Sequence, residues 1–238
     1  MASDYSAIIK YMPFAKGVYG TGSGTQPLAV GWNQPVTVTD FKATSPNFQA
    51  ALYKDSQSGK YHIAIAGTDD LKGDAMADLV LAGQDAYAVG WHPEMTDALS
   101  FSYEAIKQIR SDLERELGRP PELTDIRARV DVSGHSLGGA LAEMVGKFFG
   151  LSGYNIDGPG VTKLITRPEY GAFQDKVRED FPELESDYKL APGQFGSTAF
   201  SIVGAAGTHL DGVAFTAQPG VLADYFAMVG PLAIGVAS

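Results

Sequence analysis

The spacing of hydrophobic residues divides the first half of the chain into a hairpin and a long helix. Two apolar runs, at 48–53 and 61–66, flank the polar stretch 54–60, and this arrangement predicts two strands joined by a turn. From Thr96 onward, apolar residues recur at every third or fourth position until Gly118, as on one face of a helix. Thr96 is suited to be the N-cap of this helix, and Gly118 is suited to end it.

In the second half, strand-like and helical stretches alternate along the chain. A strand is predicted at 129–132, and it runs into a glycine-rich turn followed by an amphipathic helix that ends at Gly150. The elements expected after this helix are strands at 152–156 and 198–203 and a helix at 168–181. Strands that alternate with helices are typical of a mostly parallel central sheet with helices on both faces, so we predict an α/β fold.

The length of 238 residues is suited to one domain, and we expect a single domain over 1–238. Lid or flap elements are expected within 69–95 and 161–197. The apolar stretch 221–238 is interrupted by Pro231. It therefore predicts a buried helix or a substrate-facing flap, and we expect no transmembrane segment.

Composition and charge narrow the classes of partner. Lys plus Arg total 18 against 28 Asp plus Glu, which gives a formal charge of −10. An acidic chain is poorly suited to bind nucleic acid or an anionic membrane surface, while apolar surface could still capture a lipid substrate. Hydrophobic residues make up 45% of the chain, which is ordinary for a globular protein and argues against long disorder.

The chain has no cysteine, which excludes disulfides, thiolate catalysis and cysteine metal sites. This leaves the compartment open between the cytoplasm and secretion from a bacterium. Residues 1–10 lack the basic start and apolar run of a signal peptide, so no cleavable signal is expected. The glycine run at 20–24 has no preceding strand and no following Lys-Ser/Thr pair, so it predicts a loop and no phosphate site. We expect no metal and no other cofactor.

The segment Gly134–Gly139, with the sequence GHSLGG, carries the clearest chemical signal. It follows a predicted strand and opens an amphipathic helix, which is the context that a nucleophile elbow requires. A nucleophile on so tight a turn needs small neighbours, and Gly134 and Gly138 flank Ser136 at the required spacing. The turn also directs the amide of Leu137 toward the place where a tetrahedral oxyanion would form. We therefore predict that Ser136 is the nucleophile of a serine hydrolase.

This elbow resembles that of the class 3 lipases and related bacterial phospholipases and esterases. The stretch Ala64–Asp70 is similar to a strand of that family that ends in Arg-Gly-Ser/Thr, although Ala66 stands where the family often has Arg. Asp78 and Leu79 resemble the family's Asp-Leu after the same loop. Tyr154–Gly160 is similar to the family's segment that ends in Gly-x-Pro or Pro-Gly.

The resemblance, which spans about residues 48–220, implies an α/β-hydrolase fold and the hydrolysis of carboxylic esters, lipid esters in particular. It also implies that Thr68 supplies a second oxyanion donor beside the amide of Leu137. The fold further implies that nucleophile, acid and base follow one another in that order along the chain.

A serine nucleophile needs a histidine base that a carboxylate holds in the right tautomer. The chain has four histidines. His62 alternates on a predicted strand and is expected to be a surface or packing residue. His92 lies in a loop upstream of the elbow, and His135 belongs to the elbow itself and is expected to pack under the turn. His209 follows the strand at 198–203, at the edge of the sheet where the site must lie, and is therefore the candidate base.

Two aspartates are candidates for the triad acid. Asp157 lies at the end of the strand at 152–156 and fits the chain order with His209 as base. The resemblance instead indicates Asp211, because the stretch from Asp211 is similar to the family's Asp-x-Val segment. The family's base would then follow residue 211, where the chain has no histidine. We favour Asp211 as the acid. Three alternatives stay open for the base: His209 serves in place of the family's later histidine, that histidine lies in a segment beyond Ser238, or the triad is incomplete.

These residues predict an enzyme that hydrolyses a small-molecule or lipid ester through an acyl-enzyme on Ser136. A thioesterase or an acyltransferase on the same fold would use the same residues and stays open. The unassigned late histidine also keeps a third function open. In that case the chain is a catalytically impaired hydrolase fold that binds lipid or a partner protein.

Overall fold

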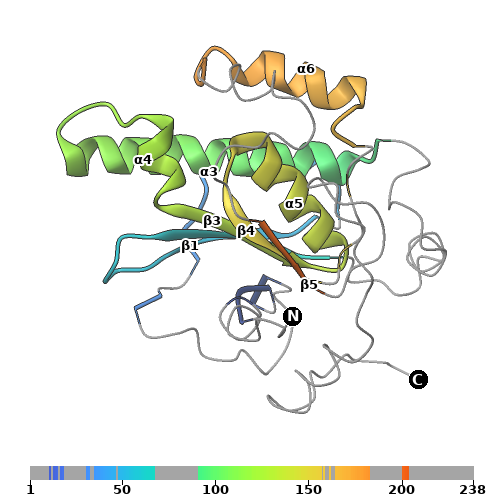
Figure 1. Ribbon diagram of the computed structural model, residues 1–238, viewed down its shortest axis with the longest axis horizontal. Helices are drawn as coiled ribbons and strands as arrows, with labels where there is room; N and C mark the ends of the chain where they lie inside the picture. Colours follow the sequence, from blue (N-terminus) through green and yellow to red (C-terminus); the bar gives the residue numbers. More distant parts are fainter. Residues whose placement is uncertain are drawn as a thin grey trace.

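The computed structural model describes residues 11, 13–15, 17–18, 31–32, 35–46, 48–67, 91–156, 158, 161, 164–182 and 200–203. The strands named within these residues are β1 (Ala50–Lys54), β2 (Tyr61–Ile65), β3 (Val130–His135), β4 (Ser152–Ile156) and β5 (Phe200–Val203). The helices are α3 (Pro93–Leu117), α4 (Leu123–Arg127), α5 (Leu137–Phe149) and α6 (Pro168–Val177). Figure 1 shows how they are arranged around one sheet.

The described strands lie side by side in the order in which they follow one another along the chain. β1 and β2 are antiparallel and form the predicted hairpin, with Ala50 opposite Ile65 and Lys54 opposite Tyr61. The strands from β2 to β5 are parallel to one another. Because parallel strands point the same way, their carboxyl ends meet at one edge of the sheet. The predicted α/β class with a mostly parallel sheet is therefore confirmed.

α3 and α5 cover one face of this sheet (Figure 1). Tyr61, Ile63 and Ile65 of β2 are buried in the main hydrophobic core together with Leu141 and Val145 of α5. Their positions two residues apart put the three β2 side chains on the same face of the strand. Each such side chain stabilises the fold by about 1.5–3 kcal/mol when it is fully buried. This core therefore fixes α5 against β2 and β3.

α6 lies on the outer side of α3 and α5 (Figure 1). The rings of Tyr170 and Phe173 pack on Phe148 of α5 at centroid distances of 5.1 and 5.4 Å. Phe173 also lies 6.4 Å from the ring of Tyr103 in α3. This helix belongs to the segment 161–197, in which the sequence predicts a lid or flap. Residues 162–163 and 183–197 of that segment lie outside the described part of the chain.

Helical residues between positions 11 and 18 lie against the opposite face of the sheet. The ring of Tyr11 is 5.1 Å from His62 and 4.4 Å from Tyr154, measured between centroids. Phe14 lies 4.3 Å from His62 in the same way. His62 is fully buried between these rings and the sheet. Of the two interpretations that the sequence allows for His62, surface or packing, the structure shows packing.

A chain of polar contacts accompanies this packing. The Tyr11 hydroxyl donates to Asp131 Oδ2 at 2.7 Å, His62 Nδ1 contacts Asp131 Oδ1, and His62 Nε2 lies 2.8 Å from Ser133 Oγ. Burial, together with the charge of Asp131, raises the pKa of the Tyr11 hydroxyl far above its ordinary value. Ser133, His62 and Asp131 are linked as in a catalytic triad. Because Ser133 and His62 are fully buried, we assign the network to holding the N-terminal region on the sheet.

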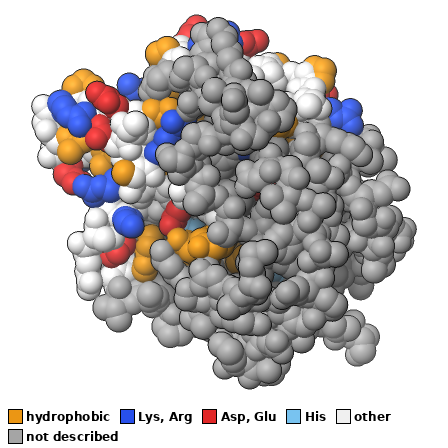
Figure 2. Space-filling view, in the orientation of Figure 1, with side chains coloured by type: hydrophobic (Ala, Val, Ile, Leu, Met, Phe, Trp, Pro, Cys, Tyr) orange, Lys and Arg blue, Asp and Glu red, His pale blue; other side chains and the backbone are white. Residues whose placement is uncertain are grey.

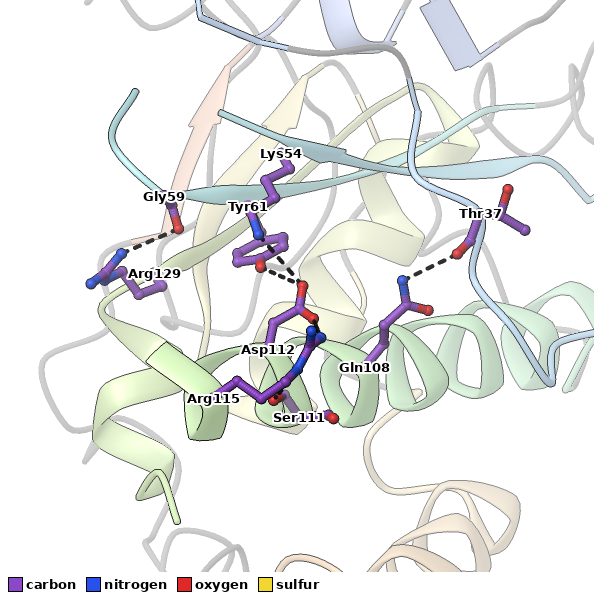
Figure 3. A network of polar contacts seen from close by, with 9 residues as sticks. All are labelled: Thr37, Lys54, Gly59, Tyr61, Gln108, Ser111, Asp112, Arg115 and Arg129. Carbon is purple, nitrogen blue, oxygen red and sulfur yellow. Dashed lines mark hydrogen bonds and ion pairs between the residues drawn. The ribbon is translucent and has the colours of Figure 1, made fainter. Parts of the chain in front are cut away.

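On the face of the sheet that α3 covers, Asp112 of α3 contacts the hairpin of β1 and β2 (Figure 3). It accepts a hydrogen bond from the Tyr61 hydroxyl at 2.8 Å, lies 3.5 Å from Lys54 Nζ and pairs with Arg115. Ion pairs at such partly exposed positions stabilise by about 1 kcal/mol or less. The contacts therefore fix the direction of α3 more than they add stability.

Acidic and basic side chains are mixed over α4 and the end of α3 (Figure 2). Arg119 lies 2.8 Å from Asp125, and Arg129 lies 2.8 Å from Glu116. Each of these two cations therefore sits beside an acidic side chain.

The start of α3 differs from the sequence prediction. The helix begins at Pro93, one turn before the predicted N-cap Thr96, because His92 takes the N-cap position and Pro93 the first helical position. The side chain of Thr96 instead accepts a hydrogen bond from Trp91 Nε1 at 2.8 Å. The predicted end at Gly118 is confirmed, since this residue has the left-handed conformation of a helix C-cap, φ 68° and ψ 15°.

The strands predicted at 48–53, 61–66 and 198–203 differ from β1, β2 and β5 by at most two residues at either end. β4 has its predicted bounds, and α5 ends at Phe149, before Gly150, as predicted. Among the helices that the structure describes, none has the length and apolar character that a membrane crossing would need.

Candidate active site

Ser136 occupies the tight turn between β3 and α5. β3 continues to His135, three residues past its predicted end at 132, so Ser136 is the single residue between strand and helix. Its backbone has φ 58° and ψ −128°, a conformation that residues other than glycine rarely adopt. Such strain costs about 1–3 kcal/mol and clusters at functional sites. A glycine would adopt these backbone angles without strain. Because the chain has serine here in spite of the strain, the group that the turn presents is the serine hydroxyl.

Hydrogen bonds from both sides hold the strained turn. The Ser136 amide donates to the Ile156 carbonyl of β4 at 2.9 Å. The Ser136 carbonyl accepts from the amides of Gly139 and Ala140 at 2.9 and 3.2 Å. The turn is therefore fixed by the neighbouring strand and by the first turn of α5. Ser136 is half-buried, so part of the residue reaches the surface.

The glycines on either side of Ser136 leave no room for a side chain. A Cβ on Gly138 would lie 2.2 Å from the Ile65 carbonyl oxygen and 2.6 Å from the Ala66 carbonyl carbon. A Cβ on Gly134 would lie 2.1 Å from the Gly138 carbonyl oxygen. All of these neighbours are backbone atoms, which cannot rotate away. These distances confirm the prediction from the sequence that the residues flanking Ser136 at positions 134 and 138 have to be small.

Leu137 begins α5, directly after Ser136. The first amides of a helix have no acceptor within the helix, and they lie at the positive end of its dipole. The Leu137 side chain is buried in the hydrophobic core, so its amide is the group that this residue offers to a ligand. The end of α5 beside Ser136 is therefore suited to stabilise a developing negative charge.

Ser136 lies at the edge of the sheet where the neighbouring parallel strands also end. Ile65, the last residue of β2, pairs with Gly134, and Ile156, the last residue of β4, pairs with His135. β5 ends beside β4 in the same direction. In α/β proteins with parallel sheets, ligands bind outside the carboxyl ends of the strands. The position of Ser136 agrees with that rule.

Four predicted site residues lie outside the described part of the chain: Thr68, Asp157, His209 and Asp211. In the sequence, Thr68 comes three residues after β2, and Asp157 directly follows β4. His209 and Asp211 come six and eight residues after β5. The roles of these four residues stay predictions.

The three described histidines have contacts of different kinds. His62 is buried against the N-terminal region, and His92 accepts the amide of Glu94 as the cap of α3. His135 precedes Ser136 and is half-buried. Burial lowers the pKa of the His135 ring from its ordinary value of 6.5, which keeps the ring neutral at pH 7.

His135 is expected to make the protein less stable in mild acid. As the pH falls through 6.5 the unfolded chain takes up a proton at this residue before the folded chain does, so the free energy of unfolding decreases until the lowered folded pKa is reached. His135→Gln should remove this contribution. Urea unfolding at about pH 8 and about pH 5 measures it. If wild type and His135→Gln lose equal amounts of stability on acidification, the lowered pKa of His135 is not the cause of the loss.

A buried polar pair that the sequence did not predict lies behind the elbow. Asn155 of β4 and Glu143 of α5 are almost completely buried, and Asn155 Nδ2 donates to Glu143 Oε2 at 2.6 Å. Asn155 Oδ1 accepts from the Gly158 amide at 2.8 Å. The sequence does contain an indication of this pair: Glu143 is a charged residue among the apolar positions of an amphipathic helix. A buried carboxyl group at such a position needs a polar partner.

Within the described residues, no group of three or more His, Cys, Asp or Glu side chains is arranged to hold a metal ion. No protein-family model matches the chain, and no curated protein matches it. The resemblance to class 3 lipases therefore rests on the motifs quoted above, and a function has to be argued from the geometry of the site.

Proposed function

We propose that this protein is a serine hydrolase of the α/β-hydrolase type that cleaves carboxylic esters through an acyl-enzyme on Ser136. The observation that carries the proposal is the backbone of Ser136, with φ 58° and ψ −128° at a one-residue turn from a parallel strand into a helix. This is the arrangement of a nucleophile elbow, beside helix amides that can bind an oxyanion. The resemblance of Gly134–Gly139 to class 3 lipases supports lipid esters as the substrate class.

In the proposed reaction the Ser136 hydroxyl oxygen attacks the ester carbonyl carbon while its proton passes to the imidazole of His209. The carbonyl electrons move onto oxygen, and this oxyanion accepts hydrogen bonds from Leu137 and Thr68. Collapse of the intermediate breaks the bond to the alcohol, which leaves with the proton from the imidazole. Water, deprotonated by the same imidazole, then releases the acid and restores Ser136.

The acid of the triad is proposed to be Asp211, with Asp157 as the alternative. Asp157 has one argument from the structure in its favour, because it directly follows Ile156, whose carbonyl accepts the amide of Ser136. Asp211 is favoured by the resemblance of its surroundings to the acid segment of class 3 lipases. Either carboxylate would hold the His209 ring in the tautomer that accepts the serine proton.

The proposed role of Thr68 is supported by the packing of β2 on the elbow. The Ile65 carbonyl, three residues before Thr68, is the atom that a Cβ on Gly138 would meet. Thr68→Val is expected to lower kcat by about 10²-fold with little change in KM, because an oxyanion donor acts mainly in the transition state. Steady-state kinetics with a p-nitrophenyl ester measure both constants. A kcat within about twofold of wild type would exclude the Thr68 hydroxyl as an oxyanion donor.

The proposal is tested with p-nitrophenyl esters of increasing acyl length, each paired with the matching thioester. Turnover of the esters, with a preference for long acyl chains, is the expected result. A preference for thioesters would instead indicate a thioesterase, and transfer of the acyl group to an alcohol in preference to water would indicate an acyltransferase. If no ester or thioester is turned over and Ser136 does not react with a phosphonate, a hydrolase fold that binds lipid or a partner protein becomes the better interpretation.

A further inference from the structure

The buried Asn155 side chain connects three parts of the structure next to the elbow. It lies on β4, donates from Nδ2 to Glu143 on α5 at 2.6 Å and accepts at Oδ1 from the Gly158 amide at 2.8 Å. Gly158 belongs to the segment that follows β4. The amide of Asn155 therefore links the helix that begins at the nucleophile to the chain that leaves the neighbouring strand.

The same group touches the elbow itself. A Cβ on Gly139, in the first turn of α5, would lie 2.3 Å from Asn155 Oδ1. A Cβ on Gly158 would lie 2.5 Å from the Ser136 carbonyl oxygen and 2.6 Å from the Ala140 amide nitrogen. Gly158 is thus in close contact with the backbone that holds the strained Ser136. A shift of Gly158 has to be transmitted to that backbone.

Packing alone does not explain a carboxyl group at position 143. Glu143 is 2% exposed on a helix whose neighbouring residues are buried hydrophobics, where an apolar side chain would avoid the cost of desolvation. What the carboxyl group provides is an acceptor for Asn155 Nδ2, which orients the amide so that its oxygen faces Gly158. Buried polar groups that satisfy one another specify a single arrangement.

We propose that Glu143 and Asn155 are positioning residues for Ser136: they fix the segment after β4 against the elbow and so hold the nucleophile in its reactive geometry. This rests on the proposed function. Neither side chain has to touch substrate. Because a misplacement of about 1 Å can cost about 10²-fold in rate, loss of the Asn155 contact should act on the chemical step rather than on binding.

The test uses the rate of phosphonylation of Ser136 by a fluorophosphonate, separated into the maximal rate and the apparent affinity of the reagent. Asn155→Asp places a carboxylate opposite Glu143 and removes the donor, so the maximal rate should fall by about 10-fold or more at about pH 8 while the affinity stays unchanged. The rate relative to wild type at the same pH should recover as the pH is lowered, because one proton shared between the two carboxylates restores a hydrogen bond.

The decisive variant is Asn155→Asp combined with Glu143→Gln. Here the amide introduced at position 143 donates to the carboxylate introduced at position 155, so this hydrogen bond is kept with its direction reversed. The carboxylate at position 155 still accepts from the Gly158 amide, so that hydrogen bond keeps its direction. The maximal rate should return to within about threefold of wild type, although each site differs from the natural residue. This double variant is also the one that keeps the test decisive if Asn155→Asp alone fails to fold.

Gln108→Glu is the matched control. Gln108 bridges two backbone groups through one side-chain amide: it donates to the Thr37 carbonyl at 3.2 Å (Figure 3) and accepts from the Thr39 amide at 3.3 Å. The same change from amide to carboxylate there should leave the maximal rate unchanged.

The outcomes separate the two proposals. A wild-type chain that does not react at Ser136 contradicts the proposed function and the inference that rests on it. A wild-type chain that reacts, with Asn155→Asp reacting equally fast, overturns only the positioning role. A folded double variant that stays as slow as Asn155→Asp overturns it as well.

Discussion

Ser136→Ala is expected to lower ester turnover by about 10⁴-fold or more while the chain keeps its fold. In the proposed reaction the hydroxyl forms the acyl-enzyme, and alanine offers no replacement nucleophile. The substitution also leaves the backbone hydrogen bonds of the turn in place, because they involve only the amide and carbonyl of this residue. Steady-state kinetics with a p-nitrophenyl ester measure the loss of turnover, and the circular dichroism spectrum shows whether the fold is kept.

Ser133→Ala is the matched control for this experiment. Ser133 lies on the same strand, three residues before the nucleophile, and is fully buried with its hydroxyl 2.8 Å from His62 Nε2. Loss of the Ser133 hydroxyl should lower the free energy of unfolding by about 1–3 kcal/mol, because the buried His62 ring loses this hydrogen bond. Turnover should stay near the wild-type value. Turnover by Ser136→Ala that is close to wild type would exclude Ser136 as the nucleophile.

Gly138→Ala is expected to lower the free energy of unfolding by about 3 kcal/mol. The added Cβ would lie 2.2 Å from the Ile65 carbonyl oxygen, so β2 and α5 would have to move apart where they join the elbow. Turnover should fall together with stability, because the same backbone carries Ser136 and the Leu137 amide that is proposed to bind the oxyanion. Urea unfolding gives the change in stability directly.

Gly171→Ala provides the comparison for that prediction. Gly171 lies in α6, and a Cβ there would meet nothing within 4 Å. Because alanine is the better helix former, this substitution should leave the protein as stable as wild type or raise its stability by about 0.5–1 kcal/mol. If Gly138→Ala is no more destabilising than Gly171→Ala, the close packing described for the elbow is wrong.

Those parts of the fold that depend on local pattern could be predicted from the sequence. The hairpin, β4, the end of α3 at Gly118 and the body of α5 follow from alternation, helical spacing and glycine stops. The elbow could be located because its glycines, its serine and the helix after them stand together in one short segment. The end of β3 could not be located in the same way, because Ser133 and Gly134 are residues typical of a turn although they continue the strand.

Contacts between distant segments could not be predicted in this way. The start of α3 depends on His92 as a cap, a role for which Ser, Thr, Asp and Asn are the usual residues. His62 is held by Tyr11 and by Asp131, which is 69 positions away along the chain, and no local pattern indicates that pairing. Asn155 and Glu143 likewise come together only because β4 lies beside α5. In each case tertiary packing, and not periodicity, decides the partner.

The central claim, that Ser136 is a catalytic nucleophile, is tested most directly by mapping a fluorophosphonate adduct on the intact protein. Trypsin releases residues 130–147 as one peptide, which holds both Ser133 and Ser136, so fragmentation within that peptide identifies the modified serine. We predict a single adduct on Ser136, none on the buried Ser133, and none anywhere in Ser136→Ala. No adduct on Ser136, or an adduct that persists in Ser136→Ala, would contradict the account.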